Sequence, residues 1–99
     1  MNMTLSDIPS EKYTLRRPVY LSVESGPEIG LVLHEPITDA MGCGMTLGLA
    51  IQELTELLVD SYEQISEYED RLAPRLLRRL EVLRSVLKLR HGALAHGAA

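Results

Sequence analysis

The chain has 99 residues, of which 45% are hydrophobic, and a formal net charge of −4. This length fits one small domain, and the surplus of acids argues against a general nucleic-acid binder, because phosphate backbones attract basic surfaces. The single cysteine, Cys43, excludes an internal disulfide. Asp7, Pro9 and Glu11 interrupt any apolar run near the start, and no stretch approaches the roughly 20 apolar residues of a membrane span. We therefore expect a cytoplasmic protein without a signal peptide.

The first third of the chain has the period of β-structure. Residues 1–12 are polar, and we predict a loose arm there. Over 13–36 apolar side chains alternate with polar ones, which indicates strands, and Ser-Gly-Pro-Glu at 25–28 favours a turn. The simplest prediction is a two-stranded hairpin at 19–24 and 29–34. A lone hairpin is marginally stable in water, so we expect it to pack on the helices or on a partner's sheet.

The longest pattern, over 46–72, is typical of an amphipathic helix. Apolar or aromatic side chains recur in steps of three and four, in a heptad seam that is interrupted only by Ser61. The seam consists of Leu47, Ile51, Leu54, Leu58, Ser61, Ile65, Tyr68 and Leu72. At about 100° per residue, an acidic edge lies opposite the seam. This edge consists of Glu53, Glu56, Asp60, Glu63, Glu67 and Asp70.

Two helices are expected in the second half of the chain. We assign the long helix to 39–72, beginning either at Asp39 or only after Thr46, because the glycines between them weaken a helix. Pro74 ends it and suits the first turn of a second helix over 74–91, which Gly92 stops, leaving 92–99 as a frayed tail. The fold class that follows is mainly α: a long antiparallel helical hairpin, preceded by a short β-hairpin or extended segment, in a single domain over 1–99.

The second helix has a wide apolar face that predicts a homodimer. Its Leu and Val side chains cover about 160°, more than one neighbouring helix can bury. Two-fold dimers are the commonest way to cover such a face, and a small-xxx-small pattern at Gly44 and Gly48 favours close approach. The predicted dimer interface consists of Gly44, Gly48, Leu76, Leu80, Val82, Leu83, Val86, Leu87 and Leu89.

The sequence contains no pattern that indicates an enzyme or a cofactor. No Gly-x-Ser-x-Gly elbow surrounds a serine, and the glycine-rich stretches lack the Lys-Ser/Thr of a phosphate loop. Met41, Cys43 and Met45 are soft sulfur ligands of the kind that bind Cu(I), but apolar packing at a helix entrance explains them more simply. We expect no catalysis, no cofactor and no bound metal.

The run TLGLAIQELTELLVDSYEQISEYEDRLAPRLLRRLEVLRSVLKLR, with the small size and the polar first segment, resembles the QslA-type anti-activators of LuxR-type quorum-sensing receptors. The resemblance implies a dimer that binds the ligand-binding domain of the receptor, blocks receptor dimerisation and so prevents DNA binding. Two other hypotheses stay open. One is a small acidic chaperone or antitoxin that sequesters an effector protein. The other is a DNA-binding repressor, suggested by a basic helix that follows a tight turn.

We expect a protein partner to bind through apolar surface, with charge as a guide. Met41, Met45 and Leu49 lie near the glycine-rich entrance of the long helix, where methionine can adapt to an uneven surface. Glu56 is the predicted partner-binding residue of the acidic edge, and this edge would speed association and orient the partner. These four are the predicted partner-binding residues, and we expect no direct contact with nucleic acid or a membrane.

Overall fold

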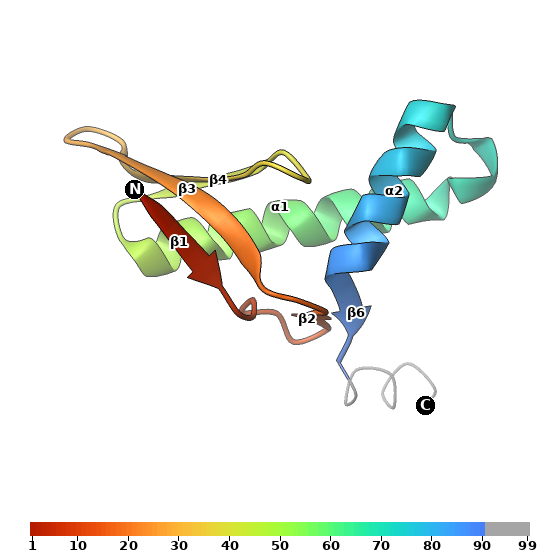
Figure 1. The fold of residues 1–99 in the computed structure, drawn as a ribbon, viewed down its shortest axis with the longest axis horizontal. Helices are drawn as coiled ribbons and strands as arrows, with labels where there is room; N and C mark the ends of the chain where they lie inside the picture. Colours follow the sequence, from red (N-terminus) through yellow and green to blue (C-terminus); the bar gives the residue numbers. More distant parts are fainter. Residues whose placement is uncertain (91–99) are drawn as a thin grey trace.

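The computed structural model describes residues 1–90 and shows an α+β fold in which six strands form two antiparallel sheets (Figure 1). In chain order the elements are β1 (Asn2–Leu5), β2 (Tyr13–Leu15), β3 (Val19–Gly26), β4 (Gly30–Glu35), β5 (Ala40–Gly44), α1 (Leu47–Glu67), the 3-10 turn η1 (Glu69–Arg71), α2 (Pro74–Val86) and β6 (Leu87–Leu89). Four strands form one sheet in the order β1-β3-β4-β5, and β2 pairs with β6 in a separate ribbon. The predicted frayed tail, 92–99, lies outside the described residues.

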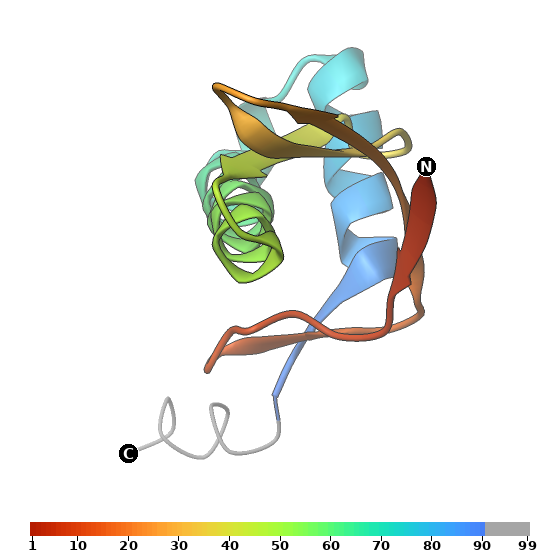
Figure 2. The same ribbon diagram turned by 90° about the vertical axis from the view of Figure 1, so that its left-hand side faces the viewer.

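The predicted helical hairpin is wrong. In Figures 1 and 2, α2 crosses α1 steeply near its C-terminal end instead of lying along it. The reason is that α1 packs chiefly on the sheet, where its buried Ala50 and Leu54 lie directly against Gly42 of β5. The heptad seam predicted which side of α1 is apolar, but it did not predict that a sheet covers that side. Of the described helices, neither is both long and apolar enough to cross a membrane.

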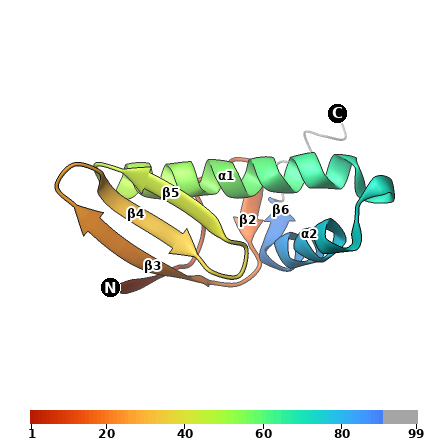
Figure 3. The same ribbon diagram turned by 90° about the horizontal axis from the view of Figure 1, so that it is seen from above.

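The predicted β-hairpin is confirmed, and it forms the middle of a larger sheet. β3 and β4 are antiparallel, with Val23 opposite Leu33 and Gly26 opposite Gly30. β1 pairs with the other side of β3, with Met3 opposite Leu21. The prediction of a loose arm over 1–12 is therefore wrong, because its first residues complete one side of the sheet. The sheet arches over α1 in Figure 2, with β5 next to the helix and β1 on the far side. Seen from above, β5 lies beside α1, and β4 and β3 follow outward from it (Figure 3).

A tight turn sends residues 40–44 into a strand and not into the long helix. The carboxylate of Glu35 is buried and accepts hydrogen bonds from the backbone N–H and the hydroxyl of Thr38, at 2.6 and 2.8 Å. Asp39 has a positive φ of 61°, which reverses the chain. β5 then runs back along β4, with Leu33 opposite Gly42. The prediction that the helix starts at Asp39 is wrong: α1 begins at Leu47, and Thr46 caps it by accepting a hydrogen bond from the N–H of Leu49.

The second helix is shorter than its sequence pattern indicated. Pro74 is its first residue, as predicted, but the helix ends at Val86 and not at residue 91. Leu87 to Leu89 continue as β6 and pair with β2, with Leu15 opposite Leu87. Leu83 and Leu87 fit one helical line in the sequence, so local pattern could not separate the helix from the strand. The backbone pairing with β2, over 70 residues away, decides it.

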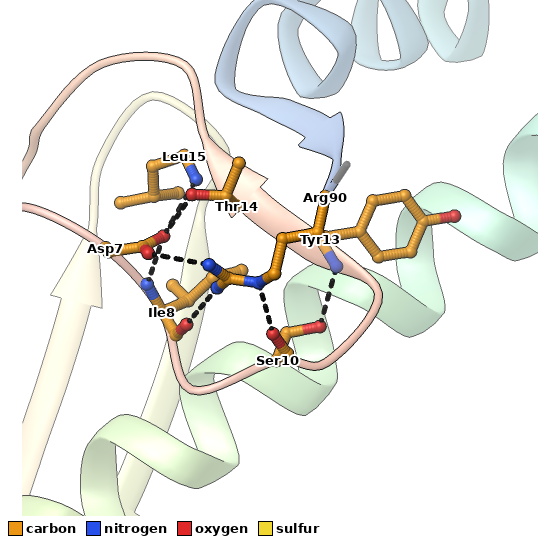
Figure 4. Close-up of polar contacts among 7 residues, drawn as sticks. All are labelled: Asp7, Ile8, Ser10, Tyr13, Thr14, Leu15 and Arg90. Atoms are coloured by element: carbon orange, nitrogen blue, oxygen red, sulfur yellow. Dashed lines mark hydrogen bonds and ion pairs between the residues drawn. The ribbon is translucent and has the colours of Figure 1, made fainter. Parts of the chain in front are cut away.

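The N-terminal loop between β1 and β2 is fastened to the end of β6 (Figure 4). Asp7 Oδ1 accepts hydrogen bonds from the Thr14 hydroxyl at 2.6 Å and from the backbone N–H of Ile8 and Leu15 at 2.9 and 3.0 Å. Asp7 Oδ2 lies 3.2 Å from a terminal nitrogen of Arg90. Burial raises the pKa of Asp7, but these hydrogen bonds outweigh it and lower that pKa to about 2.

Arg90 also donates hydrogen bonds to backbone carbonyls of the same loop. Its Nε donates to the carbonyl of Ser10 at 2.8 Å, and a terminal nitrogen donates to that of Ile8 at 3.0 Å. The backbone N–H of Arg90 also donates to the carbonyl of Lys12 at 2.8 Å. One side chain thus satisfies carbonyls that a loop of this kind would otherwise expose to solvent. These hydrogen bonds hold residues 8–12 against the end of β6.

The low pKa of Asp7 makes stability depend on pH in the acid range. The folded-state pKa lies below the ordinary value of 3.8, so Asp7 stabilises the fold fully above pH 4 and loses this contribution as the pH falls toward 2. Asp7→Asn should lower the free energy of unfolding at pH 7 by about 1 kcal/mol, since the side chain is partly exposed and the gain is screened. Urea unfolding at several pH values measures this. Glu11→Gln, which removes the charge of an exposed acid, is the control. A difference between wild type and Asp7→Asn that does not shrink below pH 4 would contradict the assignment.

A candidate protein-binding surface at the edge of the sheet

The outer edge of β5 is an open strand edge that α1 partly protects. Cys43 donates its backbone N–H to the Glu53 carboxylate at 2.7 Å, so this N–H points away from β4. Backbone groups alternate in direction along an antiparallel strand, so the N–H and C=O of Met41 point outward as well. Open edges invite pairing with another chain, and a charged side chain placed across one is a common protection. Glu53 thus occupies the backbone N–H of Cys43, and the backbone N–H and C=O of Met41 stay available to pair with another chain.

A line of exposed apolar side chains on α1 runs beside this edge. Leu49, Glu53 and Leu57 are four residues apart, so they follow one another along the helix. The contact between Glu53 and Cys43 places this line next to β5. Leu49 and Leu57 are 53% and 42% exposed, and Met45, in the connection that precedes the helix cap, is 67% exposed. We call the set of Met41, Met45, Leu49, Glu53 and Leu57 the β5–α1 surface.

Met41 belongs to this surface but faces a different direction from Leu49. Ala40, Gly42 and Gly44 of β5 face α1, so Met41 and Cys43 point to the opposite, uncovered face of the sheet. There Met41 is half exposed and lines a shallow hollow of about 260 Å³ with Val32 and His34 of β4. The outer edge of β5 therefore brings together the predicted residues Met41, Met45 and Leu49. Met41 lies on the face of the sheet that is turned away from α1, and Leu49 lies on α1 itself.

The predicted acidic edge of α1 is only partly available to a partner. Glu56 is exposed and makes no hydrogen bond within residues 1–90. Glu63 Oε2, in contrast, accepts hydrogen bonds from Lys12 Nζ at 2.7 Å and from the Tyr13 hydroxyl at 3.0 Å. The hydrogen bond from Lys12 lowers the pKa of Glu63, because it stabilises the charged carboxylate. Glu53 and Glu63 thus stabilise the fold, and Glu56 is left as a free surface charge.

The predicted dimer interface lies largely inside the chain. Leu80, Leu83, Val86 and Leu87 are buried to within 1% exposure, so a second copy cannot contact them in the folded state. This assignment is wrong for these four residues, which are buried within the chain. Leu83, Val86 and Leu87 pack in one core with residues of the ribbon, the sheet and α1. Of the other predicted positions, Leu76 and Val82 are half-buried and Leu89 is exposed. Homodimerisation itself stays a prediction.

The two glycines of the small-xxx-small pattern have different roles from the one predicted. Gly44 allows close approach, but within the chain: a Cβ there would lie 2.7 Å from the Cβ of Leu49 and 2.6 Å from the N of Ala50. Gly48 is exposed on the first turn of α1, and a Cβ there would meet only the Thr46 hydroxyl, at 4.0 Å. Their spacing of four residues is therefore not a helix–helix motif, since only Gly48 is in a helix.

Two members of the surface, Glu53 and Leu57, were not predicted as partner-binding residues. Leu57 lies off the heptad seam, one position before the buried Leu58, and an apolar residue on the acidic side of an amphipathic helix is a signal that the sequence did contain. The role of Glu53 had no such signal, because it depends on β5 lying beside α1.

Within residues 1–90, no group of three or more His, Cys, Asp or Glu side chains is arranged to hold a metal ion. No protein-family model, curated protein or solved structure matches the chain.

Proposed function

We propose that this chain is a non-enzymatic anti-activator that binds a LuxR-type transcription regulator through the β5–α1 surface, and so blocks dimerisation and DNA binding by the regulator. The identity of the partner rests on the resemblance of the 46–90 run. The mode of binding rests on one structural observation: large apolar side chains stay exposed together beside an open strand edge, on a helix face that is otherwise acidic.

The parts of this surface have separate roles in the proposal. Leu49, Met45 and Leu57 are the anchors, because apolar residues that lose water on binding contribute most of the affinity of an interface. The backbone of Met41 can add hydrogen bonds to an extended segment of the partner, as strands do when they join an open sheet edge. Glu56 and its acidic neighbours speed association with a basic partner surface and contribute less to affinity. An inhibitor of this kind competes for the apolar surface through which the regulator dimerises.

Leu49→Arg tests the proposal. This change places a charge on the apolar line at a leucine that is 53% exposed, so the fold should keep its helical content. Binding to a purified LuxR-type ligand-binding domain, measured by surface plasmon resonance, should weaken by at least about 30-fold. The matched control is Leu77→Arg, at an exposed leucine of α2 outside the β5–α1 surface, which should bind like wild type.

Three outcomes would contradict the proposal. Normal binding by Leu49→Arg would show that the β5–α1 surface is not the binding site. Equal losses of binding in Leu49→Arg and Leu77→Arg would indicate a general effect of the added charge. Failure of the wild type to bind any LuxR-type domain would show that the proposed partner is wrong. Purification of the native protein with a bound effector, or with DNA, would then favour the chaperone or the repressor.

A further inference from the structure

A hollow of about 580 Å³ lies where the β2–β6 ribbon meets α1 and α2, and it shares no residue with the β5–α1 surface. Four of the residues that line it carry cationic side chains, namely Lys12, Arg16, Arg84 and Lys88, and no acid from the described chain lines it. This concentration of positive charge is unexpected in a chain whose net charge is −4. The rest of its wall is aromatic or apolar and includes Tyr62 and Leu89.

Arg16 is held in place by the end of α2. Its backbone N–H donates to the carbonyl of Val86 at 2.7 Å, and its Nε donates to the carbonyls of Arg84 and Leu87 at 2.9 and 3.0 Å. These bonds satisfy carbonyls that the helix end leaves open. They fix the guanidinium through Nε, while its terminal nitrogens make no hydrogen bond within residues 1–90. A planar donor fork that is already oriented loses less entropy when it binds an oxyanion.

The net charge around the hollow stays positive, although two of the other cations are paired with carboxylates. Both terminal nitrogens of Arg84 bind the Glu69 carboxylate, at 2.9 and 2.6 Å, and Lys12 binds Glu63 at 2.7 Å. Lys88 is exposed, and its ammonium has no partner within residues 1–90. Four cations less the two carboxylates of Glu63 and Glu69 leave a net charge of +2. This surplus matches a phosphate dianion.

The aromatic wall adds a second recognition element. Tyr13 and Tyr62 pack edge to face, with ring centroids 5.6 Å apart and an interplanar angle of 85°. The Tyr13 hydroxyl is occupied by Glu63, which fixes the pair. Tyr62 is half-buried, so part of its ring is accessible beside the cationic residues. Aromatic rings of this kind stack on flat ligand groups, and nucleobases are the commonest example.

We propose that this hollow binds a small ligand in which a phosphate is attached to a flat or apolar group, as in a nucleoside monophosphate. Its volume lies within the range of small-ligand sites, and arginine forks suit phosphate geometry. Arg16 and Lys88 bind the phosphate, Arg84 and Lys12 add positive charge, and Tyr62 contacts the flat group. An acidic protein segment fits less well, because the cations surround one hollow and do not follow an extended path.

Isothermal titration calorimetry of the full chain at low salt, with AMP and with inorganic phosphate as probes, tests the proposal. AMP should bind with one site per chain, and phosphate should bind more weakly because it does not reach Tyr62. Lys88→Gln should weaken the binding of both probes by about fivefold or more. Arg16→Gln should weaken both further, but Arg16 also supports α2, so Lys88→Gln is the cleaner variant. Tyr62→Leu should remove only the advantage of AMP over phosphate.

Arg78→Gln is the matched control, since it removes one charge from an exposed arginine of α2 outside the hollow. It should bind AMP within about twofold of wild type. Three outcomes would overturn the proposal: no binding of AMP or phosphate at millimolar concentration, equal weakening by Lys88→Gln and Arg78→Gln, or binding of a poly-glutamate peptide in the absence of AMP binding. The last result would identify the hollow as a docking site for an acidic segment. None of these tests involves Leu49, so they are independent of the proposed function.

Discussion

Gly42→Ala should destabilise the protein by about 3 kcal/mol, the upper end of the usual cost of overpacking a core. A Cβ at this position would lie 2.5 Å from the backbone N and 2.8 Å from the Cβ of Leu54, and closer still to the carbonyl oxygen of Ala50. Two of these three atoms belong to the backbone of α1. They cannot move aside as the end of a flexible side chain can, so the whole helix has to shift away from β5.

Chemical denaturation followed by circular dichroism measures this effect. The control is Gly48→Ala, which adds the same methyl group to an open helix position and should be neutral or stabilise by up to about 1 kcal/mol. The contrast between the two variants matters more than either value. If Gly42→Ala unfolds at the same denaturant concentration as wild type, α1 does not pack on β5 in the way described.

Leu83→Ala should lower the free energy of unfolding by about 2–5 kcal/mol, the usual cost of removing a buried leucine side chain. Leu83 is 1% exposed and belongs to the cluster that joins α2 to Leu54 and Leu58 of α1. Because these neighbours come from the same chain, the loss should not depend on protein concentration. A leucine in a dimer interface would behave differently, since dilution would then lower the melting temperature.

Thermal unfolding over a hundredfold range of protein concentration distinguishes the two cases. Leu77→Ala is the control, because Leu77 lies on the exposed side of the same helix and should cost well under 1 kcal/mol. If the melting temperature of Leu83→Ala falls more steeply with dilution than that of wild type, this face of α2 is a dimer interface after all.

The candidate surface could be predicted only in part. Met41, Met45 and Leu49 were predicted from their place near the glycine-rich helix entrance and from the adaptability of methionine, and all three are exposed. Leu57 carried a signal in its place on the acidic side of the helix. Glu53 could not be found, because its role is to accept the N–H of Cys43, and that contact exists only when β5 lies beside α1. The basic hollow likewise joins Lys12 and Arg16 to Arg84 and Lys88 through the pairing of β2 with β6.

The sequence by itself determined the elements that local periodicity and caps define: a long amphipathic helix, though not whether it starts at Asp39 or after Thr46, a second helix that begins at Pro74, and the β3–β4 hairpin around its turn. Only the tertiary structure decided β1, β5 and β6. Strands of three to five residues are too short to show a period, and their backbone hydrogen bonds go to partners distant in the chain. The spacing of four between Gly44 and Gly48 suggested close approach of two helices, whereas Ala40, Gly42 and Gly44, two apart, are the small face on which α1 lies. Only the tertiary structure also shows what covers the apolar face of α2, because α1, the ribbon and the sheet bury residues that a second copy was expected to bury.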